Sequence, residues 1–220
     1  MIRVFGPFPA GSEVLSTLTQ WPWTALRTGA VVSAVAFLDV FVRGHNNLAV
    51  HGVADEVGHL ITGLMFATVL MMSGVPLSLP WALIGSVAID IDHLPWLVNW
   101  INQPDHLSRS VTHSFATVLV IAGIGLADRK RWMIWYSLAV GTLVHLLRDL
   151  ATGNVRLWWP LSDDIHLISY YGYSFSLGVA GAIIIAGSIL YPERIPSLQF
   201  ERIWSLLSRL NLKSGPGKDA

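Results

Sequence analysis

The chain contains no cysteine and few charged residues. Without cysteine there are no disulfides, thiolate metal sites or cysteine nucleophiles, so histidine and carboxylate side chains are the only strong metal ligands available. Charged residues make up 13% of the 220 positions, whereas a typical soluble domain has about 25%. Because hydrophobic residues account for 53% of the chain, the composition indicates a membrane protein.

A net charge is also lacking, since 14 Lys and Arg residues balance 14 Asp and Glu residues. No stretch resembles the basic patch with which proteins bind nucleic acid. We therefore expect no nucleic-acid partner. The chain does contain eight histidines, a generous number for a sequence with a mean hydropathy of +0.54.

Apolar stretches recur along most of the chain, each close to the about 20 residues that cross a bilayer as a helix. We expect spans at 25–42, 59–78, 80–98, 112–127, 132–149 and 174–191. The sequence therefore predicts an all-α fold, a polytopic transmembrane bundle of about six helices. The first span contains Asp39, and a cleaved signal peptide is the alternative there. The long segment before Arg27 and the lack of a cleavage region favour a retained span.

The chain divides into three predicted segments. Residues 1–24 form an N-terminal cytoplasmic or interfacial segment, 25–192 the transmembrane domain, and 193–220 a cytoplasmic tail. In the tail, one helical face carries Phe200, Ile203, Leu207 and Leu210. This pattern predicts an amphipathic C-terminal helix, lying on the inner membrane surface or packed on the end of the bundle, before a disordered end.

Basic residues are distributed unequally between the two sides of a six-span chain. The side with both termini and the loop at 128–131 holds ten Lys and Arg residues, and the other side holds four. The positive-inside rule makes the first side cytoplasmic. We therefore expect a protein of the cytoplasmic (inner) membrane with both termini in the cytoplasm.

Histidine and aspartate gather at the opposite, outward-facing ends of four predicted spans. The candidates, with one arginine, are His51, Asp55, His59, Asp90, Asp92, His93, Arg109, His113, His145 and Asp149. Carboxylates are costly where water is scarce. Several of them at one depth would repel one another unless a multivalent cation balanced their charge. The sequence therefore predicts a metal site at the outer membrane face.

The spacing of these residues supports a shared site. His145 and Asp149 are four apart and share a helix face, as do Asp55 and His59. Each also has a structural interpretation, since an isolated interfacial histidine is often only hydrogen-bonded and Asp149 could form a surface ion pair with Arg148. Together they favour metal binding. Mixed His and carboxylate ligation suits Zn²⁺ best, with Mn²⁺ or Fe²⁺ as alternatives.

The stretch around 90–95 poses a question of orientation. Asp90 and His93 share a face of a continuous helix, and Asp92 points away from it. Pro95 disfavours helix at the residue before it. We expect the helix to unwind there, so that Asp92 turns towards the metal and is a surer ligand than Asp90.

Three motifs, DIDHLP, RSVTHS and HLLRDLATGNVRLWWPLSDD, resemble in order and interval those of the YdjM-like family of membrane-bound metal-dependent hydrolases, and DEVGHLITG resembles that family's opening motif. The resemblance covers about residues 50 to 175. The matching signature positions are His59, Asp90, Asp92, His93, Arg109, Thr112, His113, Ser114, His145, Asp149 and Pro160. Many members carry histidine directly before the arginine of the second motif, where this chain has Ser108. His106, two residues earlier, is therefore not assigned as a ligand.

The resemblance implies a hydrolase that uses a metal-activated water, without naming a substrate. The expected metal ligands are Asp55, His59, Asp90, Asp92, His93, His113, His145 and Asp149, holding two ions. Asp92, Arg109 and His113 are the expected catalytic residues, with Arg109 placed to clamp a phosphate. Tryptophans near the site suggest a lipid or lipid-linked phosphoester. A fainter similarity to zinc-dependent phospholipases C hints at the same chemistry.

Two other functions stay open from the sequence. A metal- or proton-coupled transporter would place ionisable groups at mid-bilayer and repeat its helices, but only Asp39 lies within a span and no repeat is visible. A structural metal would need only four ligands, fewer than the chain offers. The roles of His51, His106 and His166 and the oligomeric state also stay open.

Overall fold

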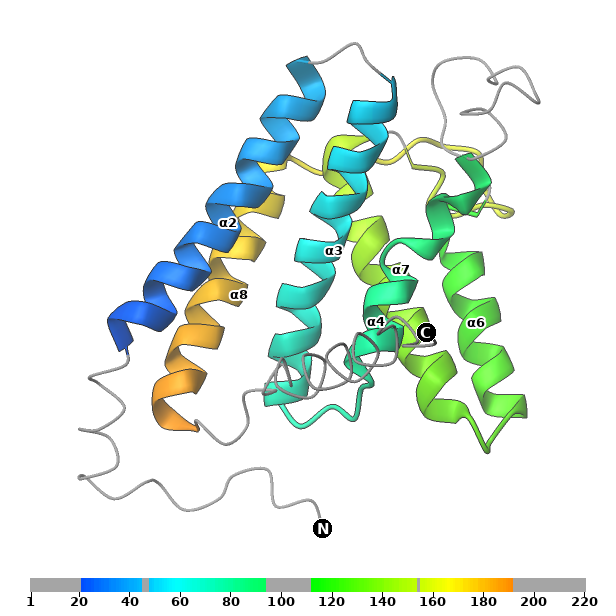
Figure 1. Cartoon of the computed structure of the whole chain (residues 1–220). Coiled ribbons are helices and arrows are strands. Elements are labelled where there is room, and N and C mark those ends of the chain that lie inside the picture. Colours follow the sequence, from blue (N-terminus) through cyan, green and yellow to red (C-terminus); the bar gives the residue numbers. More distant parts are fainter. Residues whose placement is uncertain (1–20, 45–47, 94–111, 154, 192–220) are drawn as a thin grey trace, which may run out of the picture.

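The computed structural model of the protein describes residues 21–44, 48–93, 112–153 and 155–191. These ranges contain six α-helices and one short 3-10 helix, and no strand (Figure 1). The elements are α2 (Trp21–Gly44), α3 (Leu48–Met72), α4 (Leu79–Gly85), η1 (Ala88–His93), α6 (Phe115–Ala127), α7 (Trp132–Thr152) and α8 (Tyr170–Leu190). The predicted all-α class is confirmed. The expected C-terminal amphipathic helix lies outside the described residues.

Two of the described helices are long and apolar enough to cross a bilayer, Gly52–Met72 within α3 and Tyr170–Leu190 in α8. The apolar helix α6 has only 13 residues, against the about 20 that a span requires. Large apolar side chains are also exposed outside these two helices, such as Leu126 of α6, which is 80% exposed. The full set of six spans stays a prediction.

The helix expected in the span 80–98, with unwinding near Pro95, ends earlier than predicted. The α-helix α4 ends at Gly85, ten residues before Pro95, and η1 follows. A physical reason for the break is visible at Ser86, whose carbonyl oxygen lies 2.9 Å from Nδ1 of His145 on α7. The chain turns there because α7 packs against it, and the proline is not the cause.

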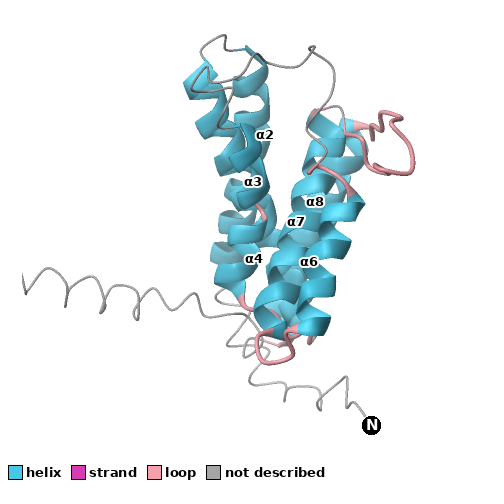
Figure 2. Ribbon diagram, turned by 90° about the vertical axis from the view of Figure 1, so that its right-hand side faces the viewer, coloured by secondary structure: helices cyan, strands magenta, loops and turns pink. Residues whose placement is uncertain are grey.

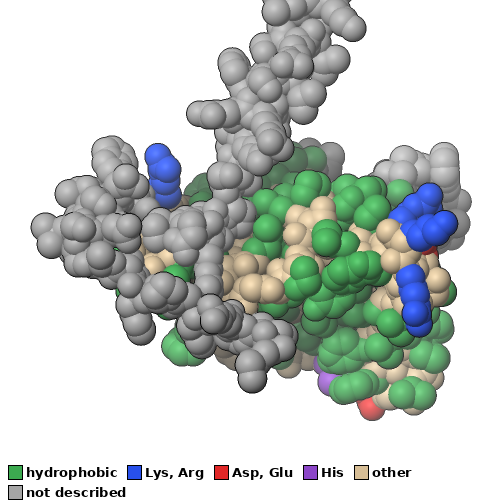
Figure 3. Space-filling model, turned by 90° about the horizontal axis from the view of Figure 1, so that it is seen from below, with side chains coloured by type: hydrophobic (Ala, Val, Ile, Leu, Met, Phe, Trp, Pro, Cys, Tyr) green, Lys and Arg blue, Asp and Glu red, His purple; other side chains and the backbone are tan. Residues whose placement is uncertain are grey.

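The helices lie in two layers, with α2, α3 and α4 in one and α6, α7 and α8 in the other (Figure 2). Helix α7 packs against α3, α4 and α6, and α8 packs against α2 and α3. Between α2, α3 and α8 lies an apolar core that includes Val35, Met65, Tyr173 and Leu177. Seen from below, apolar side chains also cover much of the described surface (Figure 3). This arrangement places α7 at the centre of the polar residues described below.

Glycines let α4 and α7 approach closely. A Cβ atom at Gly141 would collide with the carbonyl oxygen of Ala82, and one at Gly85 would collide with that of Leu138. Small residues at a helix crossing allow such backbone contact, as is common in membrane proteins. The close approach brings Ser86 within reach of His145.

We expect Gly141→Ala to destabilise the protein by about 1–3 kcal/mol, because the added methyl group forces α4 away from α7. This loss outweighs the roughly 1 kcal/mol that alanine gains over glycine in a helix. Thermal unfolding in detergent measures the effect. Gly123→Ala in α6 is the matched control, since nothing lies within 4 Å of its Cβ position. Equal stability of the two variants would contradict the close-packing argument.

Candidate metal centre

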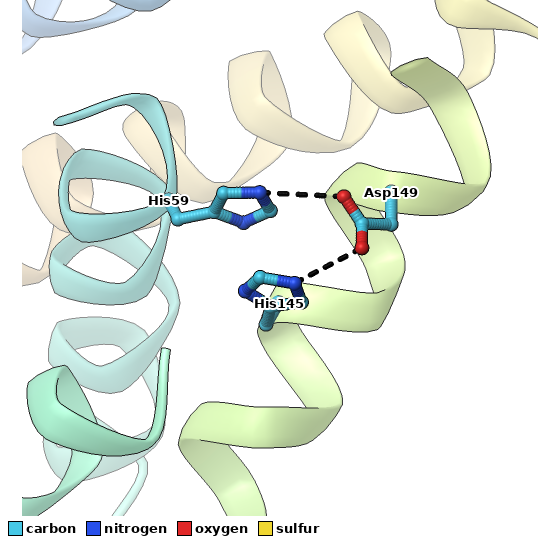
Figure 4. Close-up of side chains that lie close together, drawn as sticks. All are labelled: His59, His145 and Asp149. Carbon is cyan, nitrogen blue, oxygen red and sulfur yellow. Dashed lines mark ion pairs between the residues drawn. The ribbon is translucent and has the colours of Figure 1, made fainter. Parts of the chain in front are cut away.

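Helix α7 presents His145 and Asp149 on one face, one turn apart, and both side chains are fully buried. Nε2 of His145 lies 3.0 Å from Oδ2 of Asp149. Helix α3 brings His59 to the same place, with its Nε2 3.3 Å from Oδ1 of Asp149. The rings of His59 and His145 stack with centroids 3.7 Å apart. The three side chains therefore form one buried group between two helices (Figure 4).

Two further segments complete the group. Asp90 comes from η1 and His113 from the residues just before α6. Nε2 of His113 lies 3.0 Å from Oδ1 of Asp90 and 3.4 Å from Oδ2 of Asp149. Nε2 of His145 lies 3.6 Å from the same oxygen of Asp90. Three imidazole nitrogens and two carboxylates thus converge, and we call His59, Asp90, His113, His145 and Asp149 the His/Asp cluster.

The spacing of these donor atoms fits a metal ion. Zn²⁺ binds its ligands at about 2.0–2.1 Å in a tetrahedron, which places the ligand atoms about 3.3 Å from one another. The nitrogen–oxygen separations in the cluster lie between 3.0 and 3.9 Å. Two trios of the cluster, together with Asp55–His59–Asp90, have ligand atoms within 4.8 Å of one another. The separations therefore match a coordination sphere.

The hydrogen bond of the His145 ring also supports a metal site. Nδ1 of His145 lies 2.9 Å from the backbone carbonyl oxygen of Ser86, so Nδ1 carries the proton and a neutral ring presents the Nε2 lone pair to the cluster. That lone pair would face the oxygen of Asp149 at 3.0 Å, a repulsive contact unless a proton or a metal ion lies between them. Within the described ranges, neither ring nitrogen of His59 nor Nε2 of His145 has a hydrogen-bond partner.

The structure describes only some of the other predicted site residues. Asp55 is brought near the cluster, its Oδ1 3.9 Å from Nε2 of His59. The backbone of Asp92 and His93 lies in η1, but their side chains are outside what the structure describes, as is that of His51. Arg109 and His106 fall entirely outside the described residues. Asp90, the less favoured of the two aspartates, is the one whose carboxylate is seen in the cluster.

His166 does not join the cluster. It lies in the connection between α7 and α8, where its backbone pairs with Val155 and its Nδ1 lies 2.9 Å from the carbonyl oxygen of Asp164. Thr112 lies beside the cluster, with its hydroxyl 3.3 Å from Nδ1 of His113. Its hydroxyl is therefore placed to orient that ring, as the hydrogen-bond partners of metal-binding histidines commonly do.

The sequence interpretation missed a buried ion pair next to the cluster. Arg148 was considered as a surface partner of Asp149, but it is 1% exposed and donates hydrogen bonds to Asp39 of α2 and Asp55 of α3. The hydroxyl of Tyr170 also donates to Asp39, at 3.2 Å. Asp39 is therefore part of a buried network. A charged residue inside a predicted span is the signal that could have prompted a search for its partner.

A glycine makes room for this arginine. A Cβ atom at Gly58 would lie 2.6 Å from Nη2 of Arg148 and 2.8 Å from its Cζ. Glycine at this position of α3 therefore lets the guanidinium lie against the helix backbone directly before His59. The ion pair and the His/Asp cluster are thus built on the same two helices.

Apolar membrane-type helices around a buried His/Asp cluster define a helical membrane protein with a candidate metal centre. The model of the family described as YdjM inner membrane protein matches residues 55–212. The match extends over well more than half of the chain and includes every member of the cluster, so the chain belongs to this family. Comparison with curated proteins and with solved structures gives no match.

Proposed function

We propose that the protein is a metal-dependent hydrolase of the inner membrane that acts on a phosphoester of a lipid or lipid-linked molecule. The convergence of three histidine Nε2 atoms on the carboxylates of Asp90 and Asp149 carries this proposal. These donors come from four separate segments of the chain, and four of the five side chains are fully buried. Burial of so many polar groups is costly without a ligand to satisfy them.

The His/Asp cluster would hold the metal, Zn²⁺ suiting its donors best. A bound divalent ion supplies a Lewis acid for the phosphoryl group and a more acidic water. The chain's own residues do the rest of the positioning. The Ser86 carbonyl holds the His145 ring, Thr112 lies against the His113 ring, and burial of the cluster excludes bulk water.

The two competing functions find less support. A structural zinc needs four ligands, whereas the cluster has five donor side chains and Asp55 close by. The transporter interpretation depended on Asp39 as an isolated acid within a span. Because Asp39 is paired with Arg148, that observation has a structural explanation.

The membrane setting suggests the substrate class. Helices α3 and α8 have the length and hydropathy of spans, and the connection that follows the metal-site end of α7 exposes apolar side chains such as Trp158, Leu161 and Leu167. A lipid headgroup is the phosphoester that such surroundings would present. Arg109 as a phosphate clamp, six spans, cytoplasmic termini and an outward-facing site belong to the same proposal.

The test uses full-length protein in lipid nanodiscs, metal-free or loaded with Zn²⁺ or Mn²⁺, and a panel of phosphomonoester, phosphodiester and carboxylic-ester lipids. We expect metal-dependent release of phosphate or a phosphorylated headgroup. His113→Ala should reduce the rate at least about 100-fold, because loss of a ligand costs more than the roughly 10–100-fold of a supporting residue. His166→Ala is the control and should keep the rate. Bound metal without turnover of any ester would favour a structural metal.

A further inference from the structure

In each of the two cluster carboxylates, Asp90 and Asp149, the two oxygens approach different histidines. Asp149 places Oδ1 3.3 Å from Nε2 of His59, and Oδ2 3.0 and 3.4 Å from those of His145 and His113. Asp90 places Oδ2 3.9 Å from Nε2 of His59, and Oδ1 3.0 and 3.6 Å from those of His113 and His145. Each carboxylate therefore gives one oxygen to His59 and the other to the remaining histidines. This is how a carboxylate bridges two metal ions.

This division defines two positions of unequal completeness. The first has His113, His145 and one oxygen each from Asp90 and Asp149, which makes four donors and a complete tetrahedron. The second has His59 and the remaining oxygen of each carboxylate, which makes three donors. An ion at the second position needs a further ligand, and it must come from near His59.

Helix α3 supplies that ligand one turn before His59. Glu56 lies three residues before His59 and therefore on the same face, and its side chain interacts electrostatically with the carboxylate of Asp90. In the described part of the chain, the buried Oε2 of Glu56 has no hydrogen-bond partner. Two carboxyl groups in contact repel one another unless a proton or a cation lies between them. A divalent cation beside Glu56 would take the place of that proton and balance the charge of both carboxylates.

His59 gives independent support. Its side chain is 0% exposed, and neither of its ring nitrogens has a hydrogen-bond partner among the described residues. Its Nε2 lies 3.9 Å from Oδ1 of Asp55. Asp55 also accepts a hydrogen bond from Arg148, but a carboxylate has about four acceptor sites and can do both.

We propose that a second divalent cation binds on the α3 side of the cluster, with Asp90 and Asp149 bridging it to the first. Its ligands are His59, Glu56 and Asp55. The proposal rests on the metal centre of the proposed function, and adds Glu56 as a ligand of its own. Paired ions about 3.5–4 Å apart are typical of phosphoester hydrolysis, in which they stabilise both the attacking and the leaving oxygen.

Metal content per chain tests the proposal. Full-length protein in detergent is saturated with Zn²⁺, freed of excess ion and measured by elemental analysis. We expect two ions per chain in the native protein and one in Glu56→Gln, which keeps the shape of the side chain and loses its charge. Asp163→Asn, whose side chain is 78% exposed in the α7–α8 connection, is the control and should keep two ions. Two ions retained in Glu56→Gln would overturn the role of Glu56.

A second test uses only the native protein, so that misfolding of a variant cannot affect the result. With two equivalents of Mn²⁺, we expect an electron paramagnetic resonance spectrum of an exchange-coupled pair. The six-line spectrum of isolated ions, or a single bound Zn²⁺, would overturn the second position and leave the proposed function standing. No bound metal at all would overturn both.

Discussion

Replacing Asp149 with asparagine is expected to weaken metal binding by at least about 100-fold and to abolish hydrolysis. Asp149 contacts all three histidines of the cluster, at 3.0 to 3.4 Å, and asparagine keeps its shape but removes the negative charge. Even loss of a group that only supports a ligand costs about 10–100-fold in affinity. Direct titration with Zn²⁺ by isothermal calorimetry measures the change.

Thermal unfolding gives a second measure of the same substitution. A ligand that binds only the folded state stabilises it by about 2.7 kcal/mol at a concentration 100 times its Kd. Zn²⁺ should therefore raise the melting temperature of the native protein and leave that of Asp149→Asn nearly unchanged. The exposed Asp163→Asn is the control for charge and should respond as the native protein does. Equal stabilisation of Asp149→Asn by Zn²⁺ would exclude Asp149 as a ligand.

Replacing Arg148 with methionine is expected to destabilise the protein by about 3–5 kcal/mol. Arg148 lies 1% exposed between Asp39, which is 2% exposed, and Asp55. Removing one partner of a buried ion pair leaves the other charge without compensation, which costs about this amount. Denaturant unfolding in detergent micelles measures the loss.

Two further variants test whether the loss of stability in Arg148→Met comes from the uncompensated buried charge and not from the change of side chain alone. Arg156→Met removes an arginine whose partner Asp163 is 78% exposed, and should cost less than about 1 kcal/mol. Adding Asp39→Asn to Arg148→Met should recover part of the loss, because one of the two uncompensated carboxylates is then neutral. If Arg148→Met and Arg156→Met unfold alike, the ion pair across α2, α3 and α7 does not stabilise the fold.

The sequence by itself determined the all-helical class and most of the cluster. Hydropathy and the scarcity of charge require helices in a membrane, because only a helix satisfies its own backbone hydrogen bonds there. Within one helix the geometry is fixed, so a spacing of four residues places His145 and Asp149 on the same face. The predicted topology places the outer ends of separate helices at one membrane depth. His59 and His113 were therefore expected near His145 and Asp149.

Only the tertiary structure decided the contacts between helices. Arg148 is 93 and 109 positions from its two acid partners, and no local spacing predicts which face of α7 meets α2 and α3. The place of the Asp90 carboxylate in the cluster depends on where the chain leaves its helix. That point is set by the contact between His145 and the Ser86 carbonyl, and not by Pro95. Glu56 lies within the stretch DEVGHLITG but at none of the signature positions, and its part in the site follows only from its interaction with Asp90 of η1.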